Sequence, residues 1–80
     1  MRSVRLYSRR ECCLCQEMID QLAEFQGETA FTLELIDVDR DSKTREEYGS
    51  YVPLLEATDG ACLSQYFLDR DKLLRYLEGG

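Results

Sequence analysis

Three cysteines, Cys12, Cys13 and Cys15, lie within four positions of this 80-residue chain, one residue after the pair Arg9-Arg10. Thiolates attack disulfides and bind soft metal ions, so such a cluster can carry redox chemistry or hold a metal. Cys12 and Cys15 are three residues apart, about one helical turn, and in a helix their sulfur atoms can close a disulfide. The Cys-x-x-Cys spacing therefore predicts a dithiol that cycles between a reduced and an oxidised form.

The two cysteines of this dithiol are expected to have different roles. Cys12 attacks a substrate disulfide as the nucleophile, and Cys15 then attacks Cys12 to release the reduced substrate. A helix N-terminus carries free N–H groups and partial positive charge, which favour a thiolate. Arg9 and Arg10 add positive charge, and Arg10 is predicted to bind substrate, although the sequence does not show which arginine faces Cys12. We expect no cofactor, because the dithiol itself carries two electrons.

Other interpretations of the cysteines stay open. The chain has no histidine, so a zinc site would need all four cysteines, including the remote Cys62. An iron–sulfur cluster shared by two chains would need only thiolates, and a redox-inactive binding module would need none. We prefer the catalytic dithiol and expect no metal. Cys13 should point away from the pair as a bystander, and Cys62 is predicted to be a small buried hydrophobe.

Hydrophobic periodicity predicts the elements that position the dithiol. Residues 3–8 and 30–38 alternate as strands, and apolar residues between them recur at helical spacing from Cys13 to Gln26, with Gly27 as the C-cap. Strand, helix and strand in this order form a βαβ unit with parallel strands and a right-handed crossover. Cys12 therefore falls where the first strand meets the first helix.

The second half of the chain predicts a short helix, a hairpin and a closing helix. Asp41 or Ser42 caps the short helix and Gly49 ends it, while the nearby acids form its start and a solubilising face. Asp59-Gly60 is typical of a two-residue hairpin turn. The last helix begins near Asp69 or Asp71, places Leu73, Leu74 and Leu77 on one face, and ends at Gly79.

Length and composition limit the number of domains and the classes of partner. Residues 1–80 suffice for one α/β domain, expected as βαβαββα with a four-stranded mixed sheet flanked by helices. The net charge of −6 argues against binding to nucleic acid or anionic membranes. The N-terminus lacks the apolar core of a secretory signal, and no apolar run could span a bilayer. We therefore expect a cytoplasmic monomer.

Two segments carry a family resemblance. LYSRRECCLCQEM (6–18) and YVPLL (51–55), followed by an Asp-Gly hairpin and a terminal helix, resemble the short glutaredoxin-like branch of the thioredoxin-fold superfamily over essentially the whole chain. The resemblance implies a thioredoxin-like fold and disulfide oxidoreductase activity in electron transport. It also implies a cis peptide at Val52–Pro53, whose loop faces the cysteines. By analogy the Val52 backbone binds the substrate, with Tyr51 and Pro53 beside it.

The chain also departs from the glutaredoxin pattern. Cys13-Leu14 stands where glutaredoxins usually have Pro-Tyr, and Tyr51 stands where they usually have Thr. SQYFLDRD (64–71) replaces the Gly-Gly and Asp that hold the γ-glutamyl end of glutathione. The expected partners are a disulfide-containing protein or glutathione-type substrate, and a reductase that the sequence does not identify.

Overall fold

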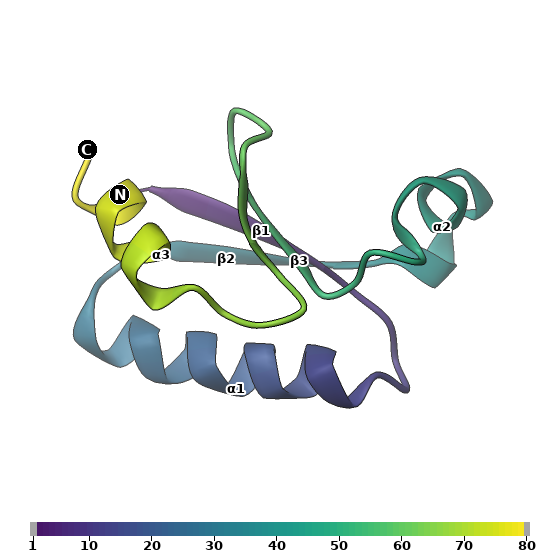
Figure 1. The fold of residues 1–80 in the computed structure, drawn as a ribbon, viewed down its shortest axis with the longest axis horizontal. Helices are drawn as coiled ribbons and strands as arrows, with labels where there is room; N and C mark the ends of the chain where they lie inside the picture. The colour runs from purple at the N-terminus through teal and green to yellow at the C-terminus, as the bar shows by residue number, and fades with distance from the viewer. Residues whose placement is uncertain (1, 80) are drawn as a thin grey trace.

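Four strands and three α-helices follow the predicted order in the computed structural model, which describes residues 2–79 (Figure 1). The four-stranded sheet has the order β2-β1-β3-β4, in which β1 and β2 are parallel and the other neighbours are antiparallel. This arrangement confirms the α/β fold class and the mixed sheet. The elements are β1 (Ser3–Ser8), α1 (Cys13–Glu28), β2 (Thr32–Asp37), the 3₁₀ helix η1 (Val38–Arg40), α2 (Ser42–Tyr48), β3 (Leu54–Ala57), β4 (Cys62–Gln65) and α3 (Arg70–Leu77).

The core lies between α1 and one face of the sheet. Helix α1 runs along the sheet (Figure 1). Helix α3 lies near the C-terminal end of α1 (Figure 1), where Arg70 pairs with Glu28 at 3.6 Å. Helix α2 lies beyond the opposite end of the sheet and buries no residue. The buried core residues are Val4, Leu6, Met18, Leu22, Phe25, Phe31, Leu55, Ala57, Leu63 and Leu73. This packing holds the N-terminus of α1 beside the end of β1, where the cysteines lie.

Helix α1 is longer than predicted, because Gly27 lies inside it and Thr29 is its C-cap. The Thr29 N–H donates to the Phe25 carbonyl at 2.9 Å, and the Phe25 ring packs edge to face on Phe31 at 6.2 Å. These contacts set the end of the helix at Thr29. A glycine lowers helix propensity, but the packing of Phe25 outweighs that local cost.

The hairpin between β3 and β4 forms where it was expected, but the prediction of a two-residue turn is wrong. The Gly60 N–H donates to the Ala57 carbonyl at 3.0 Å, and the Ala57 N–H donates to the Ala61 carbonyl at 2.9 Å. Gly60 has φ +91°, so it takes the left-handed position of a three-residue loop. The Asp59 side chain accepts from the Ala61 N–H at 3.0 Å, which favours this wider loop.

The caps of the last two helices are close to prediction. Asp41 caps α2 and Asp69 caps α3, each accepting backbone N–H groups through its carboxylate. Gly79 follows the end of α3 with φ +83°. The prediction that Leu74 lies on the buried face of α3 is wrong, because this side chain is 37% exposed. Tyr76 packs against the core instead and donates to the Ser3 carbonyl at 2.9 Å, since a tyrosine can reach a polar partner at the start of β1.

None of the helices within residues 2–79 combines the length and the apolar character that crossing a membrane requires.

Candidate functional site

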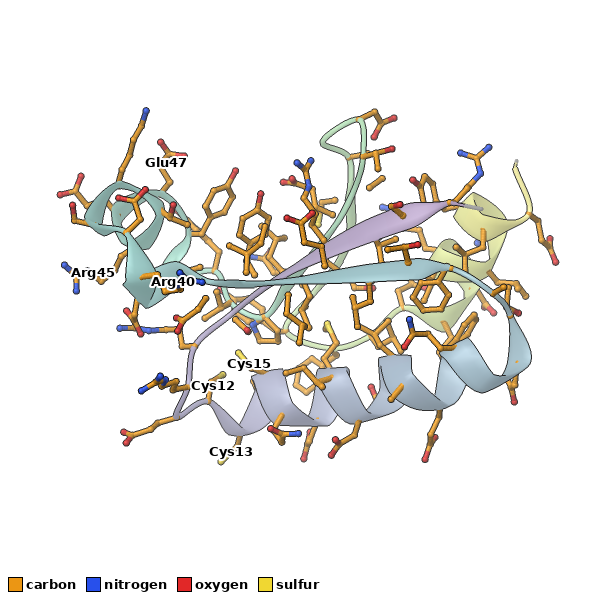
Figure 2. The ribbon with its side chains drawn as sticks, turned by 180° about the vertical axis from the view of Figure 1, so that it is seen from behind. Cys12, Cys13, Cys15, Arg40, Arg45 and Glu47 are labelled. Carbon is orange, nitrogen blue, oxygen red and sulfur yellow. The ribbon has the colours of Figure 1, made fainter. Side chains whose placement is uncertain are left out.

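The predicted reactive pair, Cys12 and Cys15, lies at the start of α1. Cys12 is the N-cap, with extended backbone angles (φ −113°, ψ 112°), and its Sγ accepts the Cys15 backbone N–H at 3.3 Å. Figure 2 shows Cys12 and Cys15 on the sheet side of the helix and Cys13 pointing away from them. The structure therefore brings the predicted nucleophile and its predicted partner together. The orientation expected for Cys13 is confirmed, and its thiol is exposed.

The two thiols of the pair differ in their exposure to solvent. Cys12 is half-buried at the surface, whereas Cys15 is only 1% exposed beneath it. Burial, followed by the hydrogen bond with Cys12, raises the pKa of Cys15 to about 11, against the lowering effect of the Arg9 backbone and charge. Cys15 is therefore a thiol at neutral pH, and Cys12 is the sulfur that a large substrate can reach.

Arg9 clamps the loop that precedes the cysteines. Its Nε and Nη2 donate to the two carboxylate oxygens of Asp39 at 3.1 and 3.0 Å, and its Nη1 donates to the Gly49 carbonyl at 3.4 Å. The paired carboxylate raises the pKa of the Arg9 guanidinium. The clamp ties the cysteine loop to η1 and to the end of α2. Sequence analysis assigned the acids near the short helix, Asp39 among them, to its start and a solubilising face, because a pair 30 residues apart leaves no local signal.

A surface pocket of about 390 Å³ opens beside Cys12, lined by Arg9, Arg10, Glu11, Cys12 and Asp39. The predicted substrate-binding residue Arg10 thus lines the same pocket as the predicted nucleophile. Arg9 is engaged by Asp39, whereas none of the salt bridges within residues 2–79 involves Arg10. Arg10 is therefore the cation of this pocket that can receive an anionic group of a ligand.

The other predicted binding residues lie on an adjoining loop. The Val52–Pro53 peptide is cis, as the resemblance implied. Pro53 is buried and Val52 half-buried, while Tyr51 is 51% exposed. None of the three lines the pocket at Cys12. The bond from Arg9 to the Gly49 carbonyl joins this loop to the cysteine loop.

The prediction for Cys62 is wrong, because its thiol is exposed. Strand β4 lies at the sheet edge, and the pairing shifts between Leu55 and Glu56, so that Glu56 faces Cys62 and Leu63 enters the core instead. Within residues 2–79 no three His, Cys, Asp or Glu side chains are grouped as metal ligands. A zinc site built on all four cysteines therefore has no geometric support.

A second, smaller groove of about 100 Å³ runs between α1 and the segment that joins β4 to α3. Sequence analysis missed it, because its two sides come from distant parts of the chain. The hint in the sequence was Leu14, an apolar residue between Cys12 and Cys15. The groove is lined by Leu14, Glu17, Met18, Gln21, Tyr66, Phe67 and Leu68.

Comparison with known proteins gives one family. A family model described as "Glutaredoxin-like domain (DUF836)" matches residues 3–78. An uncharacterized protein of Mycobacterium tuberculosis is 33% identical over 75 residues, covering 88% of this chain and 76% of that protein. The solution structure of a Nitrosomonas europaea protein matches with a TM-score of 0.79 and 36% identity, covering 94% of this chain and 89% of that one. The X-ray structure of an X. campestris protein matches with a TM-score of 0.75 and 26% identity, covering 96% and 97%.

Proposed function

The chain belongs to the glutaredoxin-like domain family, and on that premise we propose that it is a small thiol–disulfide oxidoreductase. Its substrates are protein or low-molecular-weight disulfides. Cys12 is the nucleophile and Cys15 the resolving thiol. Family membership supports the thioredoxin-type scaffold, and the arrangement of the cysteines supports the activity.

One observation carries the proposal. The Cys12 sulfur caps α1 and accepts the Cys15 N–H at 3.3 Å. A sulfur at this position receives a backbone hydrogen bond and the partial positive charge of the helix N-terminus, and both stabilise a thiolate. The same contact places the buried Cys15 next to the sulfur that it must later attack.

The reaction then proceeds in two exchanges. The Cys12 thiolate attacks one sulfur of the substrate disulfide, forming a mixed disulfide and expelling the other sulfur as a thiolate. Cys15 next attacks the Cys12 sulfur, its proton passing to the departing thiolate or to water. The second substrate thiol leaves, and a Cys12–Cys15 disulfide remains. The substrate has gained two electrons, which a reductase or glutathione must return to the protein.

The substrate would lie across the pocket and the adjoining loop. Arg10 attracts an anionic group near the attacked disulfide. The Val52 peptide groups, before the buried Pro53, are proposed to align an extended substrate segment through backbone hydrogen bonds, with Tyr51 at the rim.

The decisive experiment is a redox titration of the metal-free protein in glutathione buffers, quenched by alkylation and mapped by mass spectrometry. We expect a reversible two-electron Cys12–Cys15 disulfide with a potential between about −270 and −120 mV. The matched variants Cys12→Ser and Cys15→Ser separate the steps. Cys12→Ser loses reduction, and Cys15→Ser retains formation of the mixed disulfide. If Cys12 stays reduced across the range, the oxidoreductase proposal fails.

A further inference from the structure

We propose that the groove along α1 selects protein substrates by receiving a large aliphatic side chain close to the attacked cysteine, with a basic side chain next to it. The proposal rests on the oxidoreductase function and names its substrate class. The occupant is an extended segment of a disulfide-bearing protein rather than a small disulfide.

The position of the groove relative to Cys12 determines how far from the substrate cysteine the bound side chain must lie in the substrate sequence. The groove begins at Leu14, within the Cys-x-x-Cys sequence, and continues past Met18 to Gln21. Seven helical steps advance about 10 Å along the axis. An extended peptide covers about 3.3 Å per residue. A side chain about two to four residues from the substrate cysteine would therefore reach the groove.

The opposite wall of the groove consists of exposed aromatic residues. Phe67 is 70% exposed and Tyr66 is 40% exposed, although phenylalanine is among the residue types most often buried. The groove volume of about 100 Å³ is on the scale of one branched aliphatic side chain. Burying such a side chain against Leu14 and Phe67 removes apolar surface of both partners from water. A small polar disulfide lacks a group that could use this surface.

The backbone holds the aromatic wall in place. Tyr66 has φ +67°, an outlier for a bulky side chain. Its N–H donates to the Pro53 carbonyl at 2.8 Å, and its hydroxyl donates to the Ser50 carbonyl at 3.1 Å. Such a conformation persists only where the surrounding structure imposes it. The wall is therefore fixed to the loop that, in the proposed function, aligns the substrate.

Charge indicates the second feature of the substrate. Glu17 lines the groove, and none of the salt bridges within residues 2–79 involves it. The chain as a whole carries a net charge of −6. A lysine or arginine of the substrate next to the aliphatic side chain would meet this carboxylate. Glutathione is an anionic tripeptide without an apolar side chain, so it matches neither feature.

The test uses synthetic heptapeptide dimers joined by one disulfide. The first peptide has lysine at both ends, leucine next inward, glycine next, and cysteine at the centre, so that either chain direction presents the same groups. Two controls replace both leucines with serine, or both lysines with glutamate. Reduced protein in excess reacts with each dimer without added reductant, and the released peptide thiol is quantified after an alkylating quench.

We expect wild-type protein to reduce the leucine peptide about tenfold faster than the serine peptide. Phe67→Ser should bring this ratio below about twofold, because it removes the exposed wall of the groove. The matched control Leu35→Ser, at a 54% exposed leucine of the opposite edge strand β2, should leave the ratio unchanged. Glu17→Gln should reduce the preference for the lysine peptide over the glutamate peptide about threefold.

The outcomes separate this proposal from the function on which it rests. Equal rates for leucine and serine peptides, or a preference that survives Phe67→Ser, would overturn the groove assignment and leave the oxidoreductase intact. An unchanged charge preference in Glu17→Gln would refute the basic component. If wild-type protein reduces none of the peptides, the oxidoreductase function itself fails.

Discussion

The buried position of Cys15 predicts how slowly this thiol reacts in the reduced protein. At pH 7 a thiol with a pKa of about 11 is a thiolate in about one molecule in ten thousand, against about one in a hundred at the ordinary value of 9.0. The more basic thiolate is about six- to tenfold more nucleophilic, which offsets part of this factor of about one hundred. Alkylation of Cys15 should therefore be at least about tenfold slower than that of an ordinary thiol, and its 1% exposure slows it further.

The assay is alkylation of fully reduced protein with iodoacetamide from pH 6 to pH 10, with each cysteine quantified by peptide mapping. Cys13 serves as an internal reference, since it is exposed on the same first turn. We expect the Cys15 rate to rise about tenfold per pH unit across this range, because the thiolate fraction limits it below pH 11.

A matched variant tests the physical cause. Cys12→Ala removes the hydrogen bond and the charge that contribute to the raised pKa of Cys15, but burial, the largest cause, remains. The rate should then level off at a lower pH that is still above 9. The reasoning is refuted if Cys15 reacts as fast as Cys13 at pH 7, or if its wild-type rate levels off below pH 9.

Three further predictions concern charge and stability. Arg10→Ala should slow reduction of an anionic disulfide about two- to fivefold more than that of a neutral one, an effect that added salt weakens in initial-rate assays. Glu56→Ala leaves Arg5 and the Tyr7 hydroxyl without their shared acceptor, so unfolding in urea should show a loss of about 1–3 kcal/mol. It should also lower the Tyr7 pKa from about 12 in a tyrosinate absorbance titration, because the Glu56 charge contributes to raising it. The raised pKa of Cys15 means that the unfolded chain releases this proton first as pH rises. The free energy of unfolding should therefore fall above pH 9, by about 1.4 kcal/mol at pH 10, and Cys15→Ala should abolish that loss. Equal pH dependence in both proteins would contradict it.

Local patterns predicted the elements well where local interactions decide them. The alternation of residues 3–8 matches β1, and Asp41 and Asp69 cap the helices that follow them. These features depend on neighbours within one turn or one strand. Where packing competes with a local preference, the prediction was wrong. Gly27 should have ended α1, but the contacts of Phe25 carry the helix beyond it.

In the candidate site too, features set by neighbouring residues were predicted and features set by strand pairing were not. The Cys-x-x-Cys spacing and the helix that follows it placed Cys12 and Cys15 together, because both lie in one turn of α1. The exposure of Cys62 could not be predicted, since it depends on the edge position of β4 and on a register shift against β3. A short apolar strand can turn either of its faces to the core, and only pairing decides which one.

The sequence by itself determined the Cys-x-x-Cys motif at the start of a helix and the order of the elements, because a motif and a hydrophobic period are properties of consecutive residues. Only the tertiary structure decided the surroundings of that chemistry. It paired Arg9 with Asp39 and left Arg10 without a salt-bridge partner among residues 2–79. It also placed Phe67 opposite Leu14 in one groove. These contacts join residues at least 30 positions apart, and the packing of the sheet, the loops and α1 brings them together.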